Sequence, residues 1–160
     1  MNNKYALITG GTAGIGLDIA RELAKQGHNI LLTARREERL KEISASLKED
    51  FKVDCNYIAA DLAQVSAPEK IYNFCSENNY IVEILVNNAG YRFNKKFHET
   101  GEDEEEKFLR VLGIAVVALT KKFIPSMIEQ KQGKIMMVSS LASFAPPSSG
   151  WGALYGPVKT

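Results

Sequence analysis

The sequence is poor in the residues that build metal centres and disulfide frameworks. It contains only two cysteines, Cys55 and Cys75, and two histidines among 160 residues. The cysteines lack the spacing of a metal or redox motif and the histidines lack nearby clusters of further ligands, so we expect no metal site. Two isolated cysteines are typical of buried thiols in a reducing compartment rather than of a disulfide.

Charge of one sign and long apolar runs are also scarce. The formal net charge is only +1, which argues against a nucleic-acid surface. The longest strongly apolar run, Ile114–Leu119, is far too short to cross a bilayer, and the first residues lack the pattern of a signal peptide. We therefore expect a cytoplasmic protein that binds neither nucleic acid nor membrane.

What the sequence does contain is an alternation of strand-like and helix-like segments. The segments predicted as strands are Tyr5–Thr9, Asn29–Thr33, Asn56–Ala59, Ile84–Asn87 and Lys134–Ser139. The segments predicted as helices are Ile15–Gln26, Glu37–Lys48, Pro68–Asn78 and Glu102–Gln130. Repeated strand–helix units predict an α/β fold with a doubly wound, Rossmann-type parallel sheet. We expect one domain, residues 1–160, with five strands and the C-terminal strands of that fold missing.

A glycine-rich turn follows the first predicted strand and opens the first predicted helix. Residues 9–16 read Thr-Gly-Gly-Thr-Ala-Gly-Ile-Gly. Glycines in such a turn let the backbone approach a pyrophosphate, which the N–H groups and the helix dipole then hold. A plain glycine-rich turn is the alternative. If the turn binds a dinucleotide, the contacting residues are Gly10, Thr12, Gly14, Ile15 and Gly16.

The end of the second predicted strand indicates which dinucleotide is bound. It reads Thr33-Ala34-Arg35-Arg36 and contains no acid. An NAD site usually has an acid there for the ribose 2′-hydroxyl, whereas an arginine can hold a 2′-phosphate in a bidentate manner. We therefore expect NADP(H), with Arg35 as the main contact and Arg36 as the second choice. The alternative is that both arginines are merely solvated at a helix start.

Four motifs in chain order resemble the short-chain dehydrogenase/reductase family. They are Thr9-Gly10-x-x-x-Gly14-x-Gly16, Asp61-Leu62, Asn87-Asn88-Ala89-Gly90, and Tyr155-x-x-x-Lys159 preceded by Ser139-Ser140. The resemblance covers residues 4–160 and places every motif at the carboxyl end of a predicted strand, where open parallel sheets bind ligands.

The resemblance implies a role for each motif. Further cofactor contacts would come from Asp61, Leu62, Asn87, Ala89, Gly90, Tyr155 and Lys159. Tyr155 would be the general acid or base, beside a Lys159 ammonium that favours the phenolate. Ser140 would orient the substrate oxygen, with Ser143 as a weaker rival. The implied reaction is NADP(H)-dependent hydride transfer that interconverts a carbonyl and an alcohol on a small molecule.

The sequence departs from the family pattern in two ways. Leu112 stands where the family has an asparagine in its proton relay, so we assign no residue to that role. The sequence also ends at Thr160, one residue after Lys159, whereas the family continues through further strands and the segments through which its members commonly associate as homo-oligomers. The alternative function is therefore a truncated, non-catalytic NADP-binding module. Trp151 and Tyr91 are candidates either for the substrate pocket or for packing.

Overall fold

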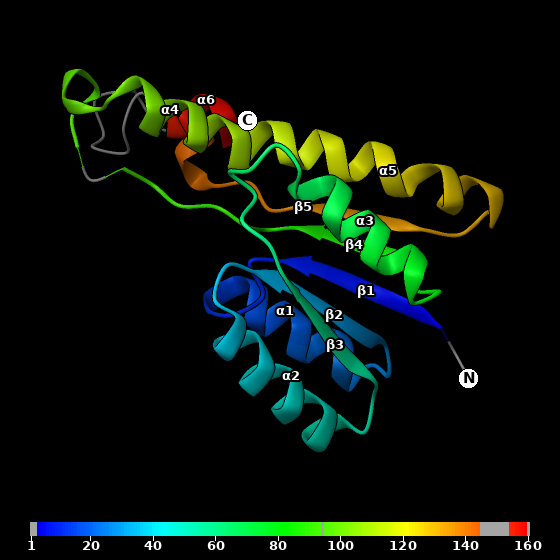
Figure 1. Ribbon diagram of the computed structural model, residues 1–160. Coiled ribbons are helices and arrows are strands. Elements are labelled where there is room, and N and C mark those ends of the chain that lie inside the picture. The colour runs from blue at the N-terminus through cyan, green and yellow to red at the C-terminus, as the bar shows by residue number, and fades with distance from the viewer. Residues whose placement is uncertain (1–2, 94, 145–153, 160) are drawn as a thin grey trace.

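A single parallel sheet organises the molecule. The computed structural model describes residues 3–93, 95–144 and 154–159. Its five strands lie in the order β3-β2-β1-β4-β5 (Figure 1). They span Lys4–Thr9 for β1, Asn29–Ala34 for β2, Cys55–Ala59 for β3, Ile81–Asn87 for β4 and Lys134–Met137 for β5. This order confirms the Rossmann-type α/β fold expected from the sequence.

The fourth strand is longer than its apolar run. It begins at Ile81 rather than at the predicted Ile84, because Glu83 interrupts the apolar pattern without interrupting the strand. The Glu83 carboxylate lies 3.1 Å from Nδ1 of His28. A polar residue with a partner of its own is therefore accommodated near the start of the strand.

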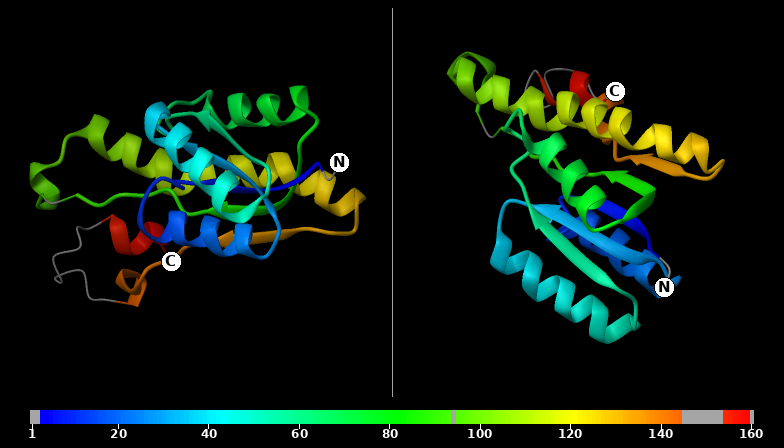
Figure 2. Two further views of the ribbon diagram at one scale, coloured as in Figure 1. Left: turned by 90° about the horizontal axis from the view of Figure 1, so that it is seen from below. Right: turned by 45° about the vertical axis from the view of Figure 1, so that its right-hand side comes forward.

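Helices cover both faces of the sheet (Figures 1 and 2). On one face lie α1 (Gly14–Lys25) and α2 (Glu37–Phe51); on the other lie α3 (Ala67–Glu77), α4 (Glu102–Leu109) and α5 (Ala115–Glu129). Successive strand residues alternate between two core clusters, with Leu7, Leu31 and Leu85 on the α3 and α5 side and Ile8, Leu32 and Val86 on the α1 and α2 side. Burial on both faces explains why the strands are almost continuously apolar.

The predicted helix over Glu102–Gln130 is continuous but not regular. A π-helical turn, Arg110–Ile114, joins α4 to α5. By length and composition alone this 28-residue helix contains an 18-residue window, with a mean hydropathy of 1.7, that is apolar enough to cross a membrane. Its buried residues, which include Phe108, Leu119 and Phe123, belong to the core cluster on the α3 side. Core helices of soluble proteins meet the same criterion.

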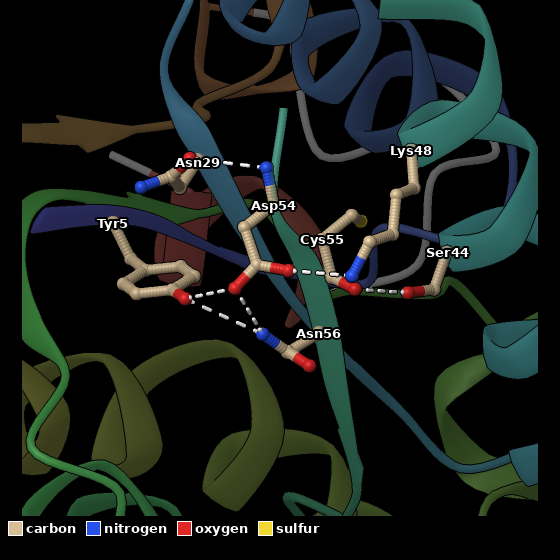
Figure 3. Close-up of polar contacts among 7 residues, drawn as sticks. All are labelled: Tyr5, Asn29, Ser44, Lys48, Asp54, Cys55 and Asn56. Carbon is tan, nitrogen blue, oxygen red and sulfur yellow. Dashed lines mark hydrogen bonds and ion pairs between the residues drawn. The ribbon is translucent and has the colours of Figure 1, made fainter. Parts of the chain in front are cut away.

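A polar network ties the strands together at the end of the sheet opposite to the glycine turn (Figure 3). The Asp54 carboxylate accepts hydrogen bonds from the Tyr5 hydroxyl at 2.5 Å, from Nδ2 of Asn56 at 2.9 Å and from Nζ of Lys48 at 2.9 Å. The Asp54 N–H donates to the side chain of Asn29 at 3.1 Å. This Tyr5–Asp54 network links β1, β2, β3 and α2 far from the glycine turn.

Candidate functional site

A cleft opens where the crossover connections diverge. After β1 the chain crosses to β2 through α1 on one face, and after β3 it crosses to β4 through α3 on the other face. Such a switch point leaves a crevice beyond the carboxyl ends of the strands. Here the crevice is a cleft of about 930 Å³, lined by residues that follow all five strands and by α6 (Tyr155–Lys159).

The glycine turn forms one wall of this cleft. Gly10 and Gly14 have φ angles of +69° and +53°, which favour glycine. At Gly16 a Cβ atom would lie 2.3 Å from Nδ2 of Asn88 and 2.5 Å from the Gly10 oxygen, so no side chain fits. Because α1 begins at Gly14, its first N–H groups lie at the turn and can hold an anion.

Two residues that sequence reasoning did not assign fix this turn against β4. The Thr9 hydroxyl donates to the Val86 oxygen at 3.2 Å and accepts from the N–H groups of Asn88 and Ala89 at 2.9 and 3.0 Å. Nδ2 of Asn88 donates to the oxygens of Thr9 at 2.9 Å and Gly10 at 3.2 Å. We call this arrangement the Thr9–Asn88 clip. In the sequence, the clip is indicated only by the polar residues at the ends of β1 and β4, two strands that pair in the sheet.

The adjacent Asn87 lies beneath the cleft instead of in its wall. Its side chain is 4% exposed, and Nδ2 donates to the Thr120 hydroxyl of α5 at 3.3 Å. Oδ1 of Asn87 has no hydrogen-bond partner among the described residues. Ala89 and Gly90 do line the cleft, as do Thr12 and Ile15. The Asn87 side chain therefore faces α5, and its contact with a cofactor stays a prediction.

Charged residues gather at the end of the cleft formed by β2 and β3. Arg35, Arg36, Asp61 and Leu62 all lie in its lining. Oδ1 of Asp61 accepts a hydrogen bond from the N–H of Ala63 at 3.1 Å, which holds the carboxylate at the strand end. Two guanidinium groups beside one carboxylate make this end net positive, so it can attract an anionic group.

The residues expected to carry catalysis line the other part of the same cleft. Ser140, Tyr155 and Lys159 are all in its wall. Nζ of Lys159 donates to the Val138 oxygen at 2.8 Å, and burial lowers the pKa of this ammonium group. The Ser143 hydroxyl donates to the Lys159 oxygen at 2.8 Å and so anchors α6 to the segment after β5. Ser140 lines the cleft together with Ser139, whereas Ser143 is not in the lining.

The π-helical turn closes the cleft behind the lysine. Leu112 is buried, and its Cγ lies 3.6 Å from the point where a Cβ of Gly90 would be. Nζ of Lys159 lies 3.5 Å from the same point. Leu112 and Nζ of Lys159 thus both lie close to Gly90, and Val111 of the same π-helical turn lines the cleft.

Tyr91 and Trp151 were candidates either for the substrate pocket or for packing, and the two cysteines were expected to be buried thiols. Tyr91 lines the cleft, whereas Trp151 lies outside the described residues. Burial raises the pKa of Cys55 to about 11 and of Cys75 to about 12, so both thiols stay protonated. Within the described ranges no three His, Cys, Asp or Glu residues gather closely enough to hold a metal ion.

Comparison with known proteins identifies the family. A family model described as short chain dehydrogenase matches residues 4–159. The chain belongs to this family. It is 33% identical over 147 residues to the very-long-chain 3-oxoacyl-CoA reductase of Rattus norvegicus, which covers 89% of this chain and 46% of the relative. This short-chain dehydrogenase therefore spans about half the length of the curated relatives that it matches.

Solved structures share the fold of this chain. The short-chain dehydrogenase from Sphingobium yanoikuyae in complex with NADPH matches with a TM-score of 0.90 and 28% identity, over 98% of this chain and 60% of that one. L-sorbose reductase from Gluconobacter frateurii, complexed with NADPH and L-sorbose, matches with a TM-score of 0.88 and 31% identity, over 99% and 61% of the two chains. Both matched structures contain the reduced dinucleotide that the cleft was expected to bind.

Proposed function

We propose that this short-chain dehydrogenase binds NADP(H) and serves the interconversion of a carbonyl and an alcohol on a small molecule. One observation carries the proposal: a single cleft holds the glycine turn, the arginine pair and the Ser140, Tyr155 and Lys159 side chains. A bound dinucleotide would explain why phosphate-binding groups and acid–base groups occur in one cleft, because it would extend from the first to the second. The NADPH complexes among the matched structures support the same reading.

The cleft fits the proposed cofactor. A Cβ at Gly16 would collide with the Gly10 oxygen and with Nδ2 of Asn88, so glycine there keeps the turn packed at the start of α1, whose backbone N–H groups would hold a pyrophosphate. Arg35 would hold the 2′-phosphate and Asp61 the adenine, because a guanidinium suits a phosphate and a carboxylate accepts from an amino group. When bound, the nicotinamide gives up or accepts a hydride.

The side chains of this protein would move the accompanying proton. The Tyr155 hydroxyl would donate a proton to the carbonyl oxygen and become a phenolate; in the reverse direction the phenolate would accept a proton from the alcohol. The Lys159 ammonium, held by the Val138 oxygen, would favour the negative charge that the phenol acquires when it donates. Ser140 would donate a hydrogen bond to the substrate oxygen and so orient it toward Tyr155.

The cofactor part of the proposal is tested by binding. Titration of NADPH and NADH should show tighter binding of NADPH by roughly tenfold or more, which is about 1.4 kcal/mol or more. Arg35→Asp should abolish this preference, because a carboxylate repels the 2′-phosphate. Arg39→Asp is the matched control: it makes the same charge change on the exposed side of α2, where Arg39 pairs with Glu42. Equal affinities for the two nucleotides in the unmutated protein would refute the NADP assignment.

A second candidate function is a nucleotide-binding module without turnover. It is favoured by Leu112, which cannot hydrogen-bond where the family resemblance places a relay asparagine. NADPH oxidation with a panel of ketones and aldehydes separates the two candidates. Turnover that Tyr155→Phe abolishes selects the enzyme. Undiminished NADPH binding without turnover, in both the unmutated protein and Tyr155→Phe, selects the module.

A further inference from the structure

Three aromatic rings meet beside the cleft, directly after the Asn-Asn-Ala-Gly segment. The Tyr91 ring lies at 90° to Phe108, with 5.4 Å between centroids, and at 89° to Phe93, with 5.9 Å. Phe93 and Phe108 stack at 4.8 Å. Phe108 is fully buried, whereas Tyr91 is 38% exposed and lines the cleft. The two phenylalanines therefore hold the Tyr91 ring in a fixed position on the cleft wall.

This ring cluster lies beside the acid–base groups of the cleft. The Phe108 ring is 6.3 Å from the Tyr155 ring between centroids, so Tyr91 and Tyr155 flank the same buried ring. Nζ of Lys159 lies 3.5 Å from the point where a Cβ of Gly90, the residue before Tyr91, would be. In the sheet order, β4 leads to Tyr91 and pairs with β5, which leads toward α6, whereas β1 separates β4 from β2 and the arginine pair.

We propose that Tyr91 forms a wall of the substrate subsite and favours carbonyl compounds that carry a flat aromatic group on the carbonyl carbon. This inference rests on the proposed function, in which the substrate oxygen meets the Tyr155 hydroxyl. A group on the carbonyl carbon then extends along the neighbouring wall. The Tyr91 and Tyr155 centroids are no farther apart than the sum of their distances to Phe108, so a substituent the size of one ring reaches Tyr91.

The surface that this substituent would meet is apolar and aromatic. Val111, on the π-helical turn that follows Phe108, is 8% exposed and lines the cleft with Tyr91. Arg92 and Lys107 also line it, and both are exposed. A ring that two other rings hold loses little conformational freedom when a ligand packs on it. Aromatic pairs gain free energy beyond that of the area they bury, so a flat ring gains more here than a puckered ring of equal size.

Two ketones that differ only in the flatness of one ring test the assignment. NMR titration of the protein saturated with NADP⁺ compares acetophenone with cyclohexyl methyl ketone; the oxidised cofactor has no hydride to give, so binding is measured without turnover. The unmutated protein should bind acetophenone more tightly by roughly 3- to 10-fold. Tyr91→Ala and Tyr91→Leu should bring this ratio to within about twofold of unity, whereas Tyr91→Phe, which keeps the ring, should preserve it.

The matched control is a second tyrosine that packs on a buried phenylalanine. Tyr72 on α3 is 37% exposed and its ring lies 5.6 Å from that of Phe123, but Tyr72 does not line the cleft. Tyr72→Ala removes a similar aromatic contact and should leave the ratio of the two affinities unchanged. Tyr91→Leu guards against a folding defect, because it keeps an apolar group on Phe108.

Failure of the inference and failure of the proposed function give different results. Equal affinities for the two ketones in the unmutated protein, or no binding of acetophenone while NADP⁺ is bound, overturn the inference alone. So does a preference for acetophenone that survives in both Tyr91→Ala and Tyr91→Leu. A large loss of NADP⁺ affinity in both variants also overturns it, because the ring would then serve the cofactor. If the unmutated protein does not bind NADP⁺, the proposed function itself fails and the inference fails with it.

Discussion

Replacing Tyr5 with phenylalanine should destabilise the protein without touching the cleft. Tyr5 is 3% exposed and packs on Tyr80 with 4.3 Å between ring centroids, and phenylalanine preserves this packing. What is lost is the hydroxyl, which donates to Asp54 at 2.5 Å. A hydrogen bond to a charged group contributes about 1.5–3 kcal/mol. Because the Asp54 side chain is 40% exposed, water replaces part of this interaction, so we expect a loss of about 1–1.5 kcal/mol.

The loss should depend on pH, because the acceptor is a carboxylate. Burial alone would raise the pKa of Asp54, but hydrogen bonds from Tyr5, Lys48 and Asn56 hold it below its ordinary value. A carboxyl group with a lowered folded-state pKa stabilises the fold above its unfolded pKa, near 3.9, and this stabilisation is lost as the pH falls through the folded pKa. The effect of Tyr5→Phe should therefore be full at pH 7 and shrink below about pH 4.

Urea unfolding at pH 7 and at pH 3.5 measures both effects. At neutral pH the thermal midpoint should also fall by roughly 2–6 °C for a protein of this size. Tyr57→Phe on β3 is the matched control, since it removes a hydroxyl from another strand of the same sheet but not from the Tyr5–Asp54 network. A change of less than about 0.3 kcal/mol at pH 7, well below the expected hydrogen-bond contribution, would refute the reasoning. So would an equal loss at both pH values.

Two further substitutions probe the cleft. Gly16→Ala should abolish NADPH binding in a titration, because its Cβ would lie 2.5 Å from the Gly10 oxygen; Gly101→Ala, where the nearest atom is 4.0 Å away, should bind normally. Leu112→Asn should raise the pKa of Lys159 toward its ordinary value, since a polar side chain admits water where burial now lowers that pKa. Leu112→Met is the control, and an NMR titration of labelled lysine that shows no difference between the two variants would contradict this.

Much of the cleft could be predicted because its residues follow strands. The strand-like runs were apolar enough to be found, and the carboxyl ends of parallel strands meet at one edge. Arg35, Ser140, Tyr155 and Lys159 therefore had to come together once the strands formed a sheet, although Arg35 and Lys159 lie far apart in the sequence. The cleft lining contains all four.

Other features depended on information that no local pattern contains. Side chains alternate along a strand, so Val86 faces α1 and α2 whereas the next residue, Asn87, faces α5. The Asn-Asn-Ala-Gly motif alone does not indicate which of its two asparagines faces the cleft. The position of Tyr91 depends on how the loop after β4 meets Phe108 of α4. The π-helical turn around Leu112 contains no proline, so a regular helix was expected there.

The Thr9–Asn88 clip bears on the entropy of cofactor binding. A glycine-rich turn is the most flexible kind of backbone, and a ligand that must order such a loop loses affinity in doing so. Here one hydroxyl and one amide side chain hold the turn to the neighbouring strand before any ligand arrives. The cradle is therefore preorganised: the glycines supply close approach to the backbone, and the Thr9 and Asn88 side chains supply the rigidity that glycine lacks.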